Sequence, residues 1–126
     1  MSTLKVATIQ DTSGNNSSTP AGIASGRAKA WAVFDQDSGV TELNDYNVSS
    51  VTDIATGRFS VHFAVAFSNA NYVGAGMAGN RTGSTTNGRD MNRDGEWTTG
   101  IAYHRVTNDV ASQIDDSYVA VVYFGD

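Results

Sequence analysis

The stretch Arg58-Phe-Ser-Val-His-Phe-Ala-Val-Ala-Phe67 decides the fold class. Large apolar residues alternate in it with small or polar ones, a period of two that is typical of a β-strand with one face in a core. The apolar positions, all on one parity, are Phe59, Val61, Phe63, Val65 and Phe67. We therefore expect a strand over 58–67 that packs against a hydrophobic layer.

Further strands are predicted on both sides of this stretch. Segments bounded by Gly, Asp and Asn read as strands at 28–34, 46–51, 72–78, 100–106 and 118–124. The connectors 35–39, 53–57 and 79–95 are rich in turn-forming residues, and no helical pattern competes. The sequence predicts an all-β protein, either an antiparallel β-sandwich or a partly closed barrel of jelly-roll-like type.

The last predicted strand, 118–124, is apolar on both parities. Such a strand is either central between two layers or packed with one face on a neighbouring subunit. The two parities are Tyr118, Ala120, Val122 and Phe124, and Val119, Val121 and Tyr123. From this pattern we predict an oligomer interface formed by Tyr118, Val119, Val121 and Tyr123.

The first 26 residues differ in composition from the rest. A short apolar strand, with Leu4, Val6 and Ile9, precedes a stretch that is almost wholly Ser, Thr, Asn, Gly, Pro and Ala. We expect an extended N-terminal arm and tether over 1–26 and a β-sandwich module over 27–126. The three apolar residues would anchor the arm to another component, and the alternative is a disordered tail.

Length and charge narrow the function classes. The 126 residues suit one domain, and the absence of cysteine excludes disulfides and thiolate sites. Eight basic against 13 acidic residues give a net charge of -5, the wrong sign for binding a phosphate backbone. There is no apolar run long enough for a membrane helix and no secretory signal pattern at the N-terminus. We expect no nucleic-acid partner and no membrane insertion.

Several blocks, in order, resemble the small fibre proteins of marine phages, such as those that infect cyanobacteria. The blocks are Ser2 to Pro20, Arg27-Ala-Lys-Ala-Trp-Ala-Val-Phe34, Tyr46-Asn-Val-Ser-Ser-Val-Thr-Asp53, Thr56-Gly-Arg-Phe-Ser-Val-His-Phe63, Ala70-Asn-Tyr72 and Val119 to Asp126. The acidic 35–43 turn departs from the family pattern, which has a Gly/Thr turn there.

The resemblance implies a virion fibre subunit, usually a homotrimer, assembled in the host cytoplasm and without catalytic activity. It leaves open whether the subunit sits on the tail or the head. It also implies that the variable 79–95 loop is the place for host recognition. An architectural head fibre or decoration protein is the alternative function, and a glycan depolymerase is a weaker one.

Two motifs suggest ligands that their context does not support. Gly74-Ala-Gly-Met-Ala-Gly79 matches a dinucleotide-binding turn, but no helix is predicted after it, so a bulge or close backbone approach in a strand is preferred. Asp90-Met-Asn-Arg-Asp-Gly95 matches the first half of a calcium loop, yet Ile101 stands where the bidentate Glu belongs. A solvated turn is preferred there, and we expect no metal and no cofactor.

The residues usual in catalysis form no recognisable set. His62 and His104 lie in different strands without a second ligand at metal spacing, and we expect His62 at the surface or between subunits. The carboxylate pairs, Asp35 with Asp37 and Asp115 with Asp116, fall in turn-like sequence. We expect a protein that is not an enzyme.

Arginine is concentrated in the polar segment 79–100. Guanidinium groups, amides and an aromatic ring together suit an anionic surface polysaccharide. The predicted receptor-binding residues are Arg81, Arg89, Asn92, Arg93 and Trp97. The alternative for Trp97 is that it packs within a hairpin.

Overall fold

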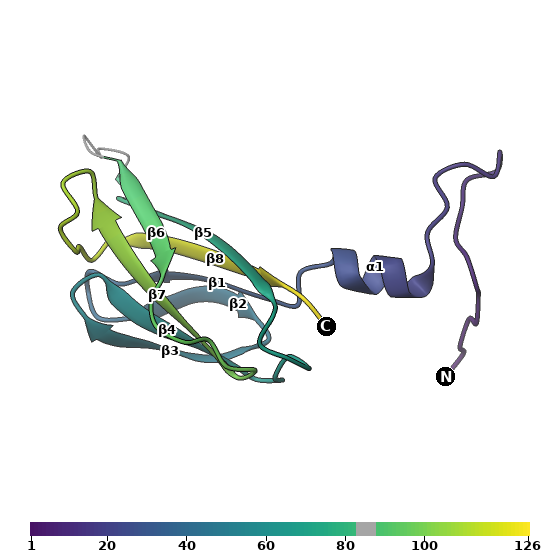
Figure 1. The fold of residues 1–126 in the computed structure, drawn as a ribbon, viewed down its shortest axis with the longest axis horizontal. Coiled ribbons are helices and arrows are strands. Elements are labelled where there is room, and N and C mark those ends of the chain that lie inside the picture. Colours follow the sequence, from purple (N-terminus) through teal and green to yellow (C-terminus); the bar gives the residue numbers. More distant parts are fainter. Residues whose placement is uncertain (83–87) are drawn as a thin grey trace.

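Two four-stranded antiparallel sheets pack face to face in the computed structural model, which describes residues 1–82 and 88–126 and, at positions 42 and 43, the backbone alone (Figure 1). The strand orders are β2-β1-β8-β5 and β3-β4-β7-β6. The described elements are α1 (Pro20–Gly26), β1 (Ala30–Asp35), β2 (Thr41–Tyr46), β3 (Val48–Ala55), β4 (Arg58–Phe63), β5 (Val73–Gly79), β6 (Arg89–Arg93), β7 (Ile101–Asn108) and β8 (Tyr118–Phe124). The prediction of an antiparallel sandwich is confirmed. A closed barrel is not formed, because each sheet ends in two edge strands.

The core lies between the sheets and is built from alternate residues of their central strands. Its aromatic rings touch across the interface: the ring of Phe34 meets that of Phe59 edge-on at 5.0 Å, and Phe63 meets Tyr123 edge-on at 5.0 Å. Edge-to-face contacts of this kind add to the stabilisation from burial. The buried side chains of the three strands that supply most of the core are Ala30, Ala32 and Phe34 in β1, Phe59, Val61 and Phe63 in β4, and Val119, Val121 and Tyr123 in β8.

The strand predicted over 58–67 ends at Phe63. Val65, on the same parity as Phe63, is 71% exposed, whereas Phe67 is buried again. The backbone turns because Ala64 and Val65 both donate hydrogen bonds to Asn47, to its main-chain oxygen (3.1 Å) and its side-chain oxygen (2.7 Å). The prediction that Val65 belongs to the core is therefore wrong.

The strand predicted over 46–51 is split between the two sheets. Tyr46 ends β2 in one sheet and Val48 begins β3 in the other. Asn47 makes the change of direction with a positive φ of 55°, a conformation that Asn adopts more readily than most residues.

Two strands lie where turns were predicted. Strand β2 begins at residue 41, inside the acidic 35–43 segment, and continues to residue 46, and residues 89–93, in the predicted 79–95 loop, form β6 against β7. In β6 the side chain of Met91 packs against the core, whereas the other four residues of the strand are polar. The sequence therefore carries only one apolar residue to indicate a strand here. Positions 83–87 of the predicted loop lie outside the described residues.

The glycines of β5 permit a close approach rather than a bulge. The register with β8 runs from Val73 to Gly79 without a shift. A Cβ at Gly74 would lie 2.5 Å from the ring of Trp97, and one at Gly76 would lie 2.7 Å from the carbonyl oxygen of Ala120. The Gly-x-Gly-x-x-Gly pattern is thus explained by packing inside a strand.

Residues 1–26 lie outside the sandwich and add no strand to either sheet (Figure 1). None of their described side chains is buried. Ile9 and Ser18 form one antiparallel bridge, with both hydrogen bonds at 2.8 Å. The last seven residues of the predicted tether form helix α1 instead. The helix begins at Pro20, and the Thr19 side chain caps it by accepting a 3.0 Å hydrogen bond from the Gly22 amide. The anchoring role of Leu4, Val6 and Ile9, all exposed, stays a prediction.

We expect Gly57→Ala to lower the free energy of unfolding by about 3 kcal/mol or more, because it combines a left-handed backbone with overpacking. Gly57 has a φ of 66°, and a Cβ there would lie 2.6 Å from both the Ile114 nitrogen and the Val106 oxygen. Gly39→Ala is the matched control, since its φ is 72° with nothing within 4 Å. We expect that control to lose only about 1–2 kcal/mol in urea denaturation, and equal losses would contradict the clash.

Candidate functional site

Two rows of outward side chains on the β2-β1-β8-β5 sheet are apolar on β1, β8 and β5, and end in Tyr46 and Asn44 on β2. The register sets Trp31 between Tyr46 and Val122, and Ala75 beyond Val122. In the next row Val33 lies between Asn44 and Ala120, with Met77 beyond. We name this surface the apolar face: Trp31, Val33, Val73, Ala75, Met77, Ala120, Val122 and Phe124, with Tyr46 at its corner. No residue of these two rows is charged.

A shallow depression of about 300 Å³ runs along the apolar face, lined among others by Trp31, Val33 and Met77. Val73 and Met77, on edge strand β5, are 64% and 63% exposed. A continuous exposed apolar surface of this kind marks an interaction site rather than an ordinary solvated sheet.

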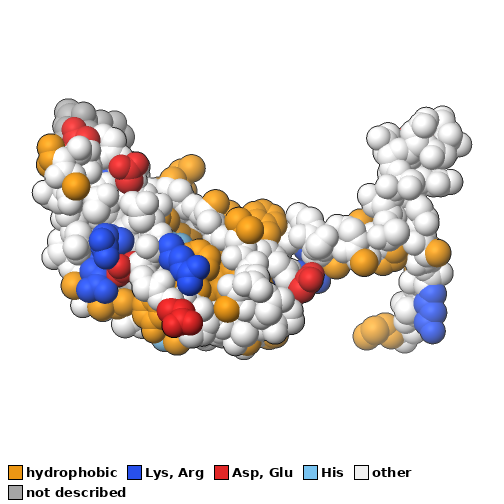
Figure 2. Space-filling view, in the orientation of Figure 1, with side chains coloured by type: hydrophobic (Ala, Val, Ile, Leu, Met, Phe, Trp, Pro, Cys, Tyr) orange, Lys and Arg blue, Asp and Glu red, His pale blue; other side chains and the backbone are white. Residues whose placement is uncertain are grey.

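The outer face of the β3-β4-β7-β6 sheet has the opposite character. Its outward positions include Thr52, His62 and Arg105, and His62 shares a 3.1 Å hydrogen bond with the Ser60 hydroxyl. Figure 2 shows basic and acidic side chains gathered over β6 and β7. A solvated sandwich normally presents polar residues like these on both outer faces, so the apolar face needs a separate explanation.

The predicted oligomer interface on β8 is wrong for three of its four residues. Val119, Val121 and Tyr123 are buried in the core of the subunit itself, where they are at most 3% exposed. The opposite parity, which includes Tyr118 and Val122, faces outward. Strand β8 is central in its sheet, but only its inner face is covered by the other sheet, so it does not lie between two layers. The alternative, that its second face packs on a neighbouring subunit, stays a prediction.

The sequence reasoning missed Trp31 and Val33 as candidate site residues. The signal was present, because both lie on the parity opposite Ala32 and Phe34, so β1, like β8, is apolar on both faces. Read together, the two neighbouring strands predict an apolar outer surface that one strand alone does not.

Two of the five predicted receptor-binding residues are parts of the folded framework. Arg89 is mostly buried and its Nε lies 2.7 Å from a carboxylate oxygen of the buried Asp116. Trp97 is 7% exposed, stacks on Tyr72 at 5.1 Å, and donates its indole N–H to the Tyr103 carbonyl at 2.7 Å. The prediction of Trp97 as an exposed aromatic platform is wrong, and the alternative of packing within the fold is confirmed.

The other three predicted receptor-binding residues are exposed, and two of them, Asn92 and Arg93, line one small depression of about 80 Å³ beside Trp97, whereas Arg81 does not line it. Arg81 follows β5, and its backbone N–H donates to the Ser117 hydroxyl. Asn92 lies on the outer side of β6. The guanidinium of Arg93 lies 5.3 Å from the centre of the Trp97 ring, a cation–π contact, and bonds the Gly95 carbonyl.

The predicted calcium-loop motif holds its second aspartate in an ion-pair cluster. Asp94 is buried, and its two carboxylate oxygens are bound by the guanidinium groups of Arg58 (2.6 Å) and Arg105. The hydrogen bond from Arg58, followed by that from Arg105, lowers the pKa of Asp94, against the opposing effect of burial. Asp90 lies in β6, so the motif forms a strand end rather than a metal loop.

His104 belongs to the core rather than to a catalytic set. Its ring stacks on Phe59 at 5.2 Å, and its Nε2 lies 2.7 Å from the Tyr123 hydroxyl. Burial lowers the pKa of His104 to about 4 and raises that of Tyr123, while burial also raises the pKa of Tyr72 to about 12. His62 and His104 lie on opposite faces of their sheet, so they cannot share a ligand.

Comparison with family models, with curated proteins and with solved structures finds no match for this chain. In residues 1–82 and 88–126, no cluster of three or more His, Asp or Glu side chains is placed to hold a metal ion. The helix in this part of the chain is too short to cross a membrane.

We expect the stability of the wild-type protein to fall by up to about 3 kcal/mol between pH 6.5 and pH 4 on account of His104. The folded pKa lies below the unfolded value, so the unfolded chain binds the proton more readily in this window, and stability is lost as the pH falls.

The measurement is urea denaturation at pH 7 and pH 4.5, comparing wild type with His104→Gln, which keeps a polar partner for Tyr123. We expect the variant to be less stable at pH 7 but to show a smaller pH-dependent loss. His62→Gln is the control and should keep the wild-type loss. Identical pH dependence in all three proteins would contradict this role of His104.

Proposed function

We propose that this chain is a non-enzymatic structural subunit of a phage fibre or similar virion appendage, in which copies associate through the apolar face as a homotrimer. The observation that carries the proposal is the uncharged surface of one sheet, which is apolar on β1, β8 and β5 and reaches Tyr46 on β2. The resemblance to small phage fibre proteins, which are usually trimeric, supports the choice of a second and third copy as the occupants.

The contrast between the two outer faces supports the same conclusion. Of 126 residues, 21 are Asp, Glu, Lys or Arg, yet none lies in the two main rows of the apolar face. Burying a side chain such as Val or Met stabilises an interface by about 1.5–3 kcal/mol. Trp31 in β1, next to the central strand β8, has the size and position of an anchor for such an interface.

Attachment to a host surface glycan is the second part of the proposal. The alternative is a head fibre or decoration protein with a purely architectural role, in which the same face assembles the subunits and nothing is bound outside the particle. In both versions the subunit is part of the virion, and residues 1–26 would join it to another virion protein.

Light scattering should give the mass of a trimer for the wild-type protein at micromolar concentration. Met77→Lys and Val122→Lys should shift it to monomer, because each removes apolar burial and requires an ammonium group to lose its water. Met77 is mostly exposed in the subunit, so its substitution leaves the fold intact.

The matched control is Thr52→Lys, on the exposed outer side of the other sheet. It should remain trimeric. A wild-type monomer, or equal dissociation by the control, would overturn assembly through the apolar face.

Deleting residues 2–19 tests the anchoring role of the N-terminal segment. Because none of their described side chains is buried, the melting temperature of the sandwich should change by less than about 2 °C. Incorporation into particles, followed by immunoblotting of purified virions, should be lost. Normal incorporation would contradict the anchor, and loss of folding would place the segment in the core.

A further inference from the structure

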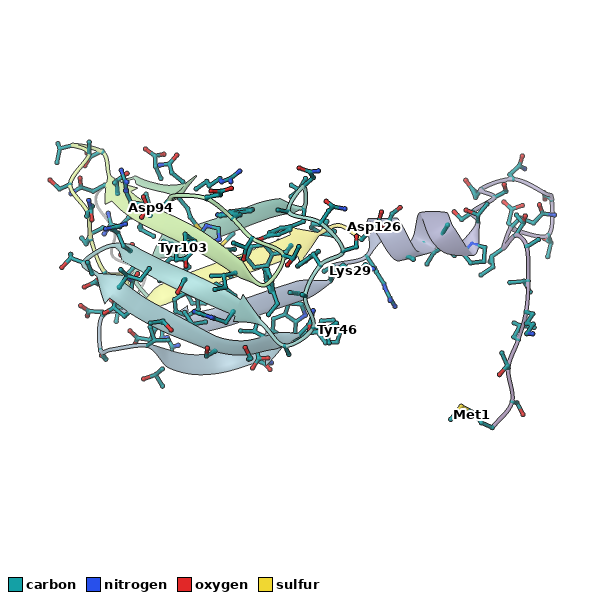
Figure 3. All side chains as sticks on the ribbon, turned by 60° about the horizontal axis from the view of Figure 1, so that its bottom comes forward. Met1, Lys29, Tyr46, Asp94, Tyr103 and Asp126 are labelled. Atoms are coloured by element: carbon teal, nitrogen blue, oxygen red, sulfur yellow. The ribbon has the colours of Figure 1, made fainter. Side chains whose placement is uncertain are left out.

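A hollow of about 440 Å³ lies at the end of the sandwich where the chain enters β1 and leaves β8. Figure 3 shows three of its lining residues, Lys29, Tyr46 and Asp126, at this same end. Arg27 and Phe67 also line it. The volume is within the range of sites for small molecules. We name this feature the end hollow.

The rim of the end hollow is held in place by Asn47. The side-chain amide of Asn47 donates to the carbonyls of Lys29 (3.0 Å) and Val65 (3.1 Å), and its oxygen accepts from the Val65 amide (2.7 Å). Three chain segments are thereby fixed around the opening. A rim set before binding lowers the entropy cost of binding a ligand.

The floor and wall of the end hollow are aromatic. Phe67 is buried and stacks on Tyr72 with ring centres 4.3 Å apart, which fixes its position. Tyr46 stands at the rim with 53% of its surface exposed, and the neighbouring Val65 is also exposed. An exposed ring beside an apolar floor suits the C–H face of a sugar better than a free ion.

The charges around the end hollow are those that would orient an acid. Arg27 and Lys29 form no ion pair with any described side chain, in contrast to Arg58, Arg89 and Arg105. Guanidinium and ammonium groups bind carboxylates through charge-assisted hydrogen bonds. Asp126, on the same rim, can accept hydrogen bonds from hydroxyl groups.

We infer that the end hollow binds a carboxylated sugar unit of an anionic surface polysaccharide. In this arrangement the ring of Tyr46 packs on the sugar, Arg27 and Lys29 hold its carboxylate, and Asp126 accepts from a hydroxyl. The inference deepens the attachment role proposed above and rests on it. It places recognition at the opposite end of β5 from Arg81, away from the segment that the sequence favoured.

The test titrates the full chain with sodium glucuronate, galacturonate and N-acetylneuraminate, and with glucose as the uncharged counterpart of glucuronate, followed by saturation-transfer NMR. At least one acid should bind with a millimolar dissociation constant and more tightly than glucose. Lys29→Ala and Tyr46→Ala should weaken binding by about tenfold, because each removes one principal contact. Tyr46→Phe should keep most of the affinity, since it keeps the ring.

Arg81→Ala is the matched control, an exposed arginine outside the hollow, and should bind like wild type. No saturable binding of any of the three acids, equal binding of glucose, or an equal loss in Arg81→Ala would overturn the inference. Light scattering on the same samples separates the two proposals. Absent binding by an intact trimer overturns the end hollow alone, and binding by a wild-type monomer overturns assembly alone.

Discussion

The three hydrogen bonds of the Asn47 side chain are the constraint on which this end of the sandwich depends. They join Lys29, just before β1, to Val65, just after β4, and each of these residues is 18 positions from Asn47 in the sequence. The same residue takes the positive φ that moves the chain from one sheet to the other. Few residues other than Asn combine tolerance of that conformation with both a donor and an acceptor. The ends of β2 and β4, and the position of Tyr46 beside the end hollow, follow from it.

The fold class could be predicted from the sequence because it depends on local periodicity. Phe59, Val61 and Phe63 alternate as a core-facing strand must, and they are all buried. The same periodicity could not predict where the strand ends. Val65 continues the pattern but is exposed, because its amide donates a hydrogen bond to the side-chain oxygen of Asn47, 18 positions earlier, and the chain turns there. A long-range contact of this kind leaves no mark on the local pattern.

The candidate site was harder to predict, because charged residues in β6 and directly after it serve the fold through partners far away in sequence. Arg89 pairs with Asp116, and Asp94 pairs with Arg58 and Arg105. A buried carboxylate is costly unless it is paired, and one arginine of the 79–100 segment, Arg89, pairs with a buried aspartate outside that segment, Asp116. Composition indicated that Arg81, Arg89 and Arg93 were available for a ligand, whereas Arg89 is already paired within the fold. Of the six arginines of the chain, three form ion pairs with buried aspartates: Arg58, Arg89 and Arg105.

The apolar face and the end hollow meet at Tyr46, so the proposed assembly and the proposed recognition would take place on adjoining surfaces. Tyr46 shares a row of the sheet with Trp31, while its exposed ring also lines the hollow. Subunits packed around a threefold axis through the apolar face would therefore hold three hollows at fixed separations. A single sugar contact of millimolar affinity is too weak to retain a particle on a cell. Three hollows held by one rigid assembly would bind a repeating polysaccharide together, because once one hollow is occupied the next sugar unit is present at a high effective concentration. The total affinity would then rise by orders of magnitude without any new contact. Assembly into a trimer would therefore allow a site that is weak in one subunit to retain the particle on a cell.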